Sequence, residues 1–198
     1  MNTSAQIDIR LGGQERHRGA IARLYLHALH EKIAPLLGTG EKAERLLSES
    51  LNLDRILVAL RDGQFLGVAG FEQHGRGVFS PRFASMFRIF GWSGGIRLLA
   101  MAMLDRSKSS DTLLMDGLAV VDEARGQGIG TLLLAAVEDH ARRLGKRGVR
   151  LDVIDTNPLA RRLYERRGYR SVKTHAVGLF RFLFSFAAST EMRKDLAA

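Results

Sequence analysis

Residues 113–130 read LLMDGLAVVDEARGQGIG, and this stretch decides the fold that the sequence predicts. It opens as an apolar run with the composition of a buried strand, and a short acidic turn follows. Gly126, Gly128 and Gly130 then alternate where a helix is expected to begin, so that the main chain can approach a ligand closely. The first N–H groups of a helix have no partner within it and lie at the positive end of its dipole. The stretch therefore predicts a phosphate site built from main chain.

The glycine segment fits one of three nucleotide-binding patterns. The dinucleotide fingerprint G-x-G-x-x-G would need a glycine in place of Thr131, and the P-loop would need a Gly-Lys-Ser/Thr sequence that is absent. The remaining pattern, R/Q-x-x-G-x-G/A after a strand, is matched by Arg125, Gly128 and Gly130. Taken alone, a glycine-rich helix start can also serve close packing, so the segment leaves that alternative open.

A second segment lies one strand and one helix further along the chain. Residues 157–169 read NPLARRLYERRGY. This segment resembles the signature N-x-x-A-x-x-x-Y-E-x-x-G-[FY] of the GNAT superfamily of N-acetyltransferases, and the glycine segment resembles the acyl-CoA pyrophosphate loop of the same family. The two occur in the order and spacing that the family has. The close resemblance spans residues 113–169, whereas the flanking regions agree in element order only.

The composition favours one domain spanning residues 1–198, because a chain of this length with 45% hydrophobic residues can bury a sizeable core. The absence of cysteine excludes disulfides, thiolate metal sites and a cysteine nucleophile, and it fits a reducing compartment. The N-terminal sequence MNTSAQIDIR has no apolar core of signal-peptide length, and no apolar run approaches a membrane span. We therefore expect a cytoplasmic protein with no membrane partner.

The charge of the chain suits an anionic ligand. The formal net charge is +9, and lysine and arginine are dispersed rather than gathered in a recognition motif. A polyanionic cofactor therefore fits better than a nucleic acid, which we do not expect as a partner. His27 and His30 lie one helical turn apart, but no third ligand is indicated, so no metal is expected.

Hydrophobic periodicity predicts an α/β chain of the α+β kind that opens in the order β-α-α-β-β. Because a helix connects the strands at residues 113–121 and 149–155, these two strands should be parallel and adjacent. The connecting helix is amphipathic, with Glu138 among the charged residues on its outer face. The expected elements are a strand at 7–11, a helix from residue 14 broken by Pro35 and residues 38–40, a helix at 41–49, strands at 55–60 and 64–71 joined by a turn at Asp62 and Gly63, the strand at 113–121, helices at 128–145 and 159–167 on either side of the strand at 149–155, a strand at 169–177 and a last strand ending near residue 194.

Residues 76–109 form a predicted helical insertion without a counterpart in the minimal fold. Ser80 and Pro81 are a good helix start, and two apolar helical segments follow. These segments suit additional core, a dimer contact or a wall of the acceptor pocket. Between them, GWSGG matches the G-x-S-x-G pattern of a hydrolase nucleophile elbow at Ser93, but that motif requires a strand followed by a helix. Alternating phenylalanines at residues 180–186 likewise suit core or a paired edge in a homodimer.

The resemblance implies the GNAT fold, a mixed central sheet flanked by helices in which the two parallel strands splay apart. Acetyl-CoA would enter the gap, and its pantetheine arm would pair with β-strand main chain as an added strand does. The resemblance assigns these cofactor contacts: main chain of Leu118, Ala119 and Val120 for pantetheine, amides of Gly126, Gln127, Gly128, Ile129 and Gly130 for the pyrophosphate, Arg125 beside the phosphates, Asn157 at the pantetheine or thioester, and Tyr164 near the sulfur.

The implied activity is transfer of an acetyl group from acetyl-CoA to a primary amine by direct attack, which needs no covalent enzyme intermediate. Tyr164 falls at the family's tyrosine and is the candidate general acid for the leaving thiolate. An amide near Leu118 could stabilise the oxyanion. An amine with a pKa of about 10.4 is almost entirely charged at neutral pH, so a base or an ordered water must take its proton.

The base remains open among Asp116, Glu72, His74 and water, with a purely structural role for Asp116 as the alternative. A small molecule or a peptide could supply the amine, since no segment carries a signature of the acceptor. Two other classes of function are weaker candidates: a non-catalytic acyl-CoA-binding module on the same fold, and a hydrolase that uses Ser93.

Overall fold

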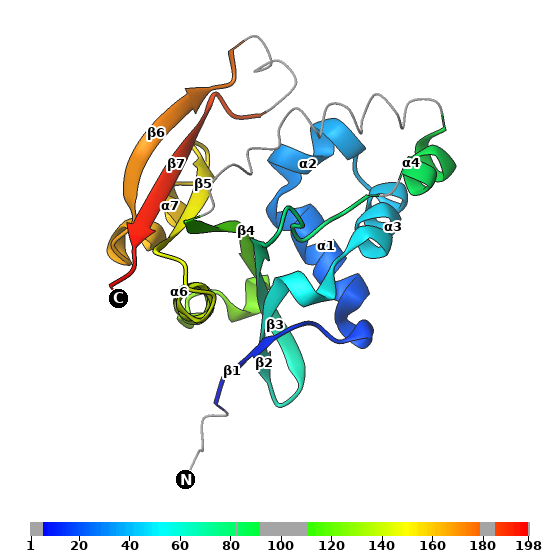
Figure 1. Cartoon of the computed structure of the whole chain (residues 1–198). Coiled ribbons are helices and arrows are strands. Elements are labelled where there is room, and N and C mark those ends of the chain that lie inside the picture. The colour runs from blue at the N-terminus through cyan, green and yellow to red at the C-terminus, as the bar shows by residue number, and fades with distance from the viewer. Residues whose placement is uncertain (1–5, 82, 92–110, 179–184, 198) are drawn as a thin grey trace.

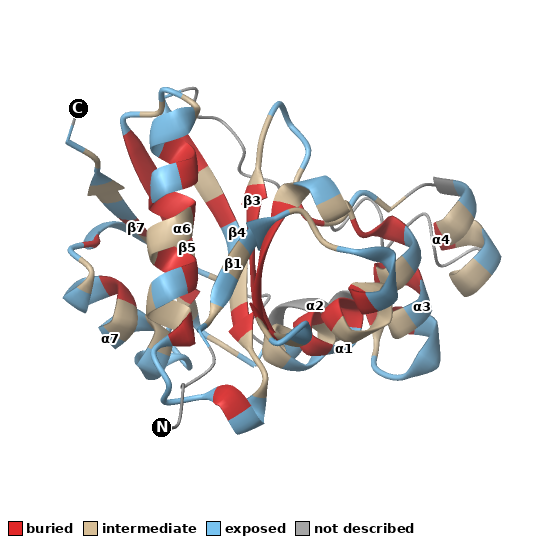
Figure 2. Cartoon of the chain, turned by 90° about the horizontal axis from the view of Figure 1, so that it is seen from below, coloured by how far each residue is buried: buried red, intermediate tan, exposed pale blue. Residues whose placement is uncertain are grey.

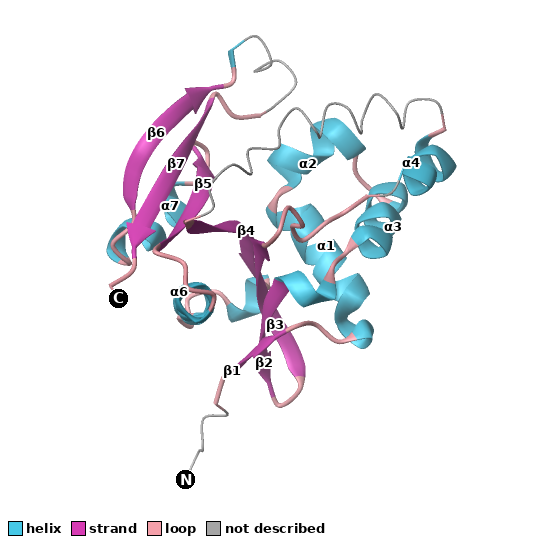
Figure 3. Cartoon of the chain, viewed as in Figure 1, coloured by secondary structure: helices cyan, strands magenta, loops and turns pink. Residues whose placement is uncertain are grey.

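The computed structural model of the chain describes residues 6–81, 83–91, 111–178 and 185–197. A seven-stranded sheet runs through this part of the chain in the order β1-β2-β3-β4-β5-β7-β6 (Figure 1). Neighbouring strands are antiparallel except β4 and β5, which are parallel. The strands are β1 (Asp8–Leu11), β2 (Ile56–Arg61), β3 (Gln64–Glu72), β4 (Thr112–Val120), β5 (Gly148–Ile154), β6 (Arg170–Ala176) and β7 (Ala188–Asp195). The helices are α1 (Arg18–Ala28), α2 (His30–Leu37), α3 (Glu41–Ser50), α4 (Phe83–Phe90), α6 (Ile129–Arg143) and α7 (Pro158–Arg166) (Figure 3).

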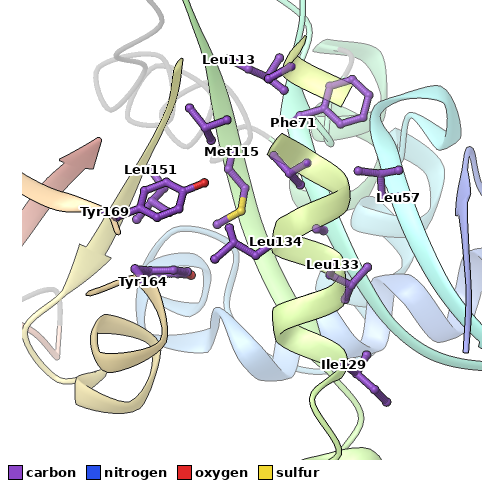
Figure 4. Close-up of a cluster of buried hydrophobic side chains, with 14 of the residues drawn as sticks. Leu57, Phe71, Leu113, Met115, Ile129, Leu133, Leu134, Leu151, Tyr164 and Tyr169 are labelled. Carbon is purple, nitrogen blue, oxygen red and sulfur yellow. The ribbon is translucent and has the colours of Figure 1, made fainter. Parts of the chain in front are cut away.

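Helices cover both faces of the sheet (Figure 2). On one face α6 and α7 close a buried cluster with β2, β3, β4, β5 and β7, part of which Figure 4 shows. On the other face α1 packs against β2 and β3, α3 packs against α1, and α4 packs farther out against α3. Strand β2 serves both layers, because Leu57 and Ala59 face α6 while Ile56, Val58 and Leu60 face α1, as alternating strand residues do. The sheet is thus buried on both sides in its centre.

The parallel pair at the centre of the sheet is short. Cα partners join Thr112 to Gly148, Leu113 to Val149 and Leu114 to Arg150, and the pairing ends there. Both strands continue beyond this point, β4 to Val120 and β5 to Ile154, so they splay apart (Figure 1). This mixed sheet with a splayed parallel pair and flanking helices confirms the predicted fold.

The helix expected from residue 14 is divided differently from the prediction. After a short 3-10 turn, α1 ends at Ala28, because Leu29 leaves the helical region, and α2 begins at His30. Pro35 lies inside α2 and does not break it, so that part of the prediction is wrong. The break comes earlier, at Leu29, and α2 ends where Gly38 adopts a φ of +75°, which suits glycine.

Within the described residues, the other predicted elements are found within a few residues of their expected ends. The hairpin turn at Asp62 and Gly63 has positive φ at both residues, as a type I′ turn requires. The last strand, β7, lies between β5 and β6 rather than at the sheet edge. Ser93, residues 96–104, for which a second helix of the insertion was predicted, and most of the phenylalanine-rich segment (179–184) lie outside the described residues.

Candidate functional site

A β-bulge marks the point where β4 leaves β5. Met115 pairs with Phe71 and Leu118 pairs with Ala69, so two residues of β4, Asp116 and Gly117, stand opposite the single residue Gly70. Gly117 has a φ of +94°, and a Cβ there would lie 3.1 Å from Cε1 of Tyr25. A bulge bends its strand and increases the local twist, which directs the end of β4 away from β5.

After the bulge, some main-chain groups of β4 face the gap between β4 and β5. The amide of Val121, just after β4, donates to the carbonyl of Leu66 in β3 at 2.9 Å. Main-chain groups alternate between the two edges of a strand, so those of Ala119 also face β3, whereas those of Leu118 and Val120 face the β5 side. Leu118 and Val120 therefore have the orientation that pairing with a pantetheine arm requires. The contact assigned to all three residues stays a prediction.

The glycine segment between β4 and α6 has open space above it. Gly126 and Gly128 have φ of +76° and +79°, and a Cβ on either would meet no atom within 4 Å. Helix α6 begins at Ile129, and in the part of the chain that the structure describes, the amides of Gly128, Ile129, Gly130 and Thr131 have no protein acceptor. The main chain here is exposed at a helix N-terminus, as a phosphate site requires.

Gly130 serves a different purpose from the two glycines before it. A Cβ on Gly130 would lie 3.3 Å from Cδ2 of Leu163 and 3.7 Å from Cδ2 of Leu118. This glycine therefore lets α6 pack closely against α7 and β4. The close-packing role that the sequence left open thus applies to Gly130. Open space above the main chain, here called the cradle, is found at Gly126 and Gly128.

Two arginines lie at the glycine segment, one of them unforeseen. Arg125 pairs with Asp122 at 2.7 Å. Gln127 accepts a hydrogen bond from Nη2 of Arg61 at 2.7 Å and donates from Nε2 to the carbonyl of Glu123 at 3.2 Å. Arg61 ends β2, far away in the sequence, and no motif marks it.

A cavity of about 210 Å³ lies at the carboxyl ends of the splayed strands. Residues from α1 and α2 form one wall, and Arg125 with the segment after β5 forms the other. The hydroxyl of Thr156 hydrogen-bonds to Glu31 and so joins the two walls, and His27 approaches Asp122 at 3.8 Å. Its lining residues are His27, Ala28, His30, Glu31, Arg125, Ile154, Thr156 and Asn157.

Asn157 is the N-cap of α7 as well as a wall of this cavity. Its Oδ1 accepts a hydrogen bond from the amide of Ala160 at 3.0 Å, and Pro158 occupies the first helical position. The capping bond fixes the side chain and uses one of its two polar atoms. Nδ2 is left to donate to a ligand in the cavity.

Tyr164 is buried between α7 and the sheet, with 6% of its surface exposed. Its ring centroid lies 6.0 Å from that of Tyr169, and the ring points from α7 toward Leu134 of α6 (Figure 4). Burial raises the pKa of Tyr164 to about 12. The phenol is therefore protonated throughout the neutral range, the state that a general acid needs.

Asp116 stands on the bulge, on the face of the sheet that α1 covers. Its Oδ2 accepts a hydrogen bond from the amide of Val78 at 3.1 Å, and the residue is exposed. Beneath it lies Tyr25, fully buried, whose hydroxyl has no hydrogen-bond partner among the described residues. Burial, and then the charge of Asp116, raise the pKa of Tyr25 well above its usual value. Asp116 is thus the candidate base at the strand divergence.

The other two candidate bases lie farther along β3. Glu72 is half-buried and pairs with Leu114, the last residue of β4 that also pairs with β5. His74 is exposed in a tight turn between Gln73 and Arg76, with a φ of +53°. Of the three candidates, only Asp116 belongs to the bulge itself.

Two further features bear on the class of site. Among the described residues, no group of three or more histidine, aspartate or glutamate side chains could hold a metal ion. No helix in the described ranges is long and apolar enough to span a bilayer.

Comparison with known proteins identifies the class of protein. A model of the acetyltransferase (GNAT) family matches residues 25–169, and the chain therefore belongs to this family of acyltransferases, which use acetyl-CoA. No curated protein matches the sequence.

Solved structures share the fold over nearly the whole chain. One described as an acetyltransferase is 24% identical, covers 96% of this chain and 100% of its own, and has a TM-score of 0.64. YncA from Salmonella typhimurium, solved with acetyl-CoA, is 20% identical, with coverage of 98% and 96% and a TM-score of 0.64. An N-acetyltransferase from Staphylococcus aureus Mu50 is 18% identical, with coverage of 98% and 100% and a TM-score of 0.63.

Proposed function

We propose that the protein transfers the acetyl group of acetyl-CoA to a primary amine by direct nucleophilic attack. The observation that supports this most strongly is the free helix N-terminus at Gly128 next to strands that part after Leu114. The helix N-terminus suits the diphosphate of acetyl-CoA. The gap between the parted strands suits its pantetheine arm. The absence of cysteine from the chain agrees with a mechanism that has no acyl-cysteine intermediate.

The residues present suit acetyl-CoA as a co-substrate, which supplies an activated acyl carbonyl. Gly126 and Gly128 leave the space that phosphates would fill, and the amides of α6 are free to donate to them. Leu118 and Val120 would hydrogen-bond the pantetheine arm along the gap. Asn157 would donate from Nδ2 into the cavity. An amide at Leu118 is also suited to hold the developing oxyanion.

Tyr164 is proposed to protonate the departing thiolate. A phenol with a pKa of about 12 is a weaker acid than a free phenol, so transfer to a thiolate of ordinary pKa, about 8.5, would be costly. The same burial also raises the pKa of a thiol, because it disfavours the charged form of either group. In the site, the pKa of the Tyr164 phenol and that of the departing thiol are therefore closer than a comparison of about 12 with the ordinary thiol value suggests.

Asp116 is proposed to accept the proton of the incoming ammonium, directly or through water. Its Oδ2 accepts the hydrogen bond from the amide of Val78, which fixes the carboxylate at the bulge. A carboxylate is a weak base toward an amine, so its contribution is electrostatic as well as acid–base: it favours the approach of a cationic acceptor. The proposed acceptor is accordingly a small molecule or a peptide that bears a primary amine.

The test is turnover of acetyl-CoA against a panel of polyamines, aminoglycosides, amino acids and peptides, with the released thiol titrated by a chromogenic disulfide. The protein itself contributes no thiol to this assay, because it contains no cysteine. Thiol release that depends on both the enzyme and the amine supports the proposal. CoA binding without turnover on any amine would instead support a non-catalytic acyl-CoA-binding module.

Assembly and location are part of the same proposal. We propose a cytoplasmic enzyme that forms a homodimer, on the strength of the composition and the apolar insertion noted in the sequence. Light scattering after size-exclusion chromatography measures the mass directly. A mass equal to that of the 21.9 kDa chain would contradict the dimer.

A further inference from the structure

Arg61 places a second guanidinium at the glycine segment. It is the last residue of β2, and its pairing with Gln64 closes the β2–β3 hairpin. Its Nη2 donates to Oε1 of Gln127 at 2.7 Å, across a sequence separation of 66 residues. Gln127 is in turn bonded through Nε2 to the carbonyl of Glu123 at 3.2 Å. The backbone of Arg61 is therefore held by the β2–β3 hairpin, and its guanidinium is held at the glycine segment by Gln127.

The two arginines at this segment differ in how their charge is balanced. Arg125, the arginine of the sequence motif, pairs with Asp122 at 2.7 Å, and both side chains are more than half exposed. Arg61 has no carboxylate partner in the part of the chain that the structure describes, and its acceptor at Gln127 is a neutral amide oxygen. Of these two arginines, Arg61 is therefore the one whose positive charge is not balanced by a carboxylate in the described structure, whereas the charge of Arg125 is balanced by Asp122.

We infer that Arg61 binds a phosphate group of acetyl-CoA; this inference rests on the proposed function. A guanidinium forms stronger hydrogen bonds with phosphate oxygens than with an amide oxygen, because the phosphate is charged and accepts two N–H groups side by side. Open space surrounds Gly126 and Gly128, so nothing in the described structure separates that region from solvent. Gln127 then acts as a positioning residue that holds Arg61 at the edge of this space before the ligand arrives.

The phosphate that Arg61 contacts is either the diphosphate or the 3′-phosphate of the ribose. Both offer the same chemistry, and titration calorimetry with CoA and with 3′-dephospho-CoA distinguishes them.

The variant that tests the contact is Arg61→Gln. Arg10→Gln is the matched control, because Arg10 is also a strand arginine, on the neighbouring β1, and its loss changes the net charge equally. Pantetheine, which has no phosphate, is measured with each protein by displacement of CoA.

We expect Arg61→Gln to raise the Kd of CoA by about tenfold or more, since a charge-assisted hydrogen bond is lost, while Arg10→Gln leaves it within about twofold. An equal loss with 3′-dephospho-CoA assigns the contact to the diphosphate, and a loss confined to CoA assigns it to the 3′-phosphate. Both results support the inference. Unchanged affinity for CoA, or an equal loss for pantetheine, overturns it.

The proposed function is tested separately by the wild-type protein. If that protein does not bind CoA, the proposed function fails. If it binds CoA and Arg61→Gln binds equally well, only the assignment of Arg61 fails.

Discussion

The carboxylate of Asp116 accepts a hydrogen bond of 3.1 Å from the backbone amide of Val78. This bond ties the bulge in β4 to the segment that follows β3. Gly77 makes the approach possible, because a Cβ there would lie 2.7 Å from Oδ2 of Asp116. The side chain is therefore held in place where the parallel strands diverge, and its hydrogen bond and its charge can be tested apart.

Replacing Asp116 with asparagine separates these two contributions. The Oδ1 atom of asparagine can still accept the bond from Val78, so the fold and CoA affinity should be retained. If the charge takes part in proton transfer, kcat/KM should fall by about 100-fold or more. Rates within about twofold of wild type would show that Asp116 is a structural acceptor only. Asp116→Ala, which loses the bond as well, should also be less stable to urea by about 1 kcal/mol.

Tyr164→Phe removes one hydroxyl from a buried ring. The ring contacts remain, so we expect CoA affinity to change little while kcat falls by about 100-fold or more. Tyr169→Phe is the matched control, since the two rings are neighbours and both are buried. Single-turnover rates on the best amine of the panel measure the step directly. Equal rates for Tyr164→Phe and wild type would assign Tyr164 to the core alone.

The raised pKa of Tyr164 predicts a loss of stability in alkaline solution. In the unfolded chain the phenol deprotonates near its ordinary value of about 10, whereas the folded protein holds the proton to about 12. Between these values the unfolded state binds fewer protons, so the free energy of unfolding falls as pH rises, and below them the contribution is constant. Urea unfolding at pH 9 and pH 11 measures the change. The loss should be smaller in Tyr164→Phe by about 1 kcal/mol, and an equal loss in both proteins would contradict the raised pKa.

Gly128→Val tests the main-chain cradle against a control on the same helix. Gly128 and Gly145 flank α6, both have positive φ, and a Cβ on either would meet no atom within 4 Å. Valine should therefore destabilise the protein similarly at both positions, by about 1–2 kcal/mol. Only Gly128→Val should also weaken CoA binding, because its side chain enters the space above the free amides. Equal CoA affinity in the two variants would count against the cradle.

Local sequence patterns predicted those features that depend on neighbouring residues. The strand–glycine–helix junction at residues 113–130 follows from residue types and their spacing, and so do the hairpin turn at Asp62 and Gly63 and the helix predicted at 159–167. Each is set by local backbone preferences, and the structure has each of them where it was expected. The splay of β4 from β5 was predicted only from the family resemblance, because the separation of two strands does not depend on neighbouring residues alone.

The features that were missed depend on contacts between distant segments. Glu138 was expected on the outer face of its helix, yet its side chain is 3% exposed and pairs with Arg167 at 3.1 Å and Lys194 at 2.7 Å. A buried carboxylate is tolerated when cations balance it, and here both lie outside its own helix. The bond from Arg61 to Gln127 and the insertion of β7 beside β5 were missed for the same reason.

Hydrogen exchange of the backbone amides, with and without CoA, tests the central claim most directly. The claim is that the free amides at residues 128–131 bind the diphosphate and that β4 main chain at residues 118–120 binds the arm that follows it. We expect CoA to slow exchange in peptides covering these two segments and to leave residues 142–147, at the other end of α6, unchanged. If CoA binds and neither segment changes, the cofactor lies elsewhere and the account is contradicted.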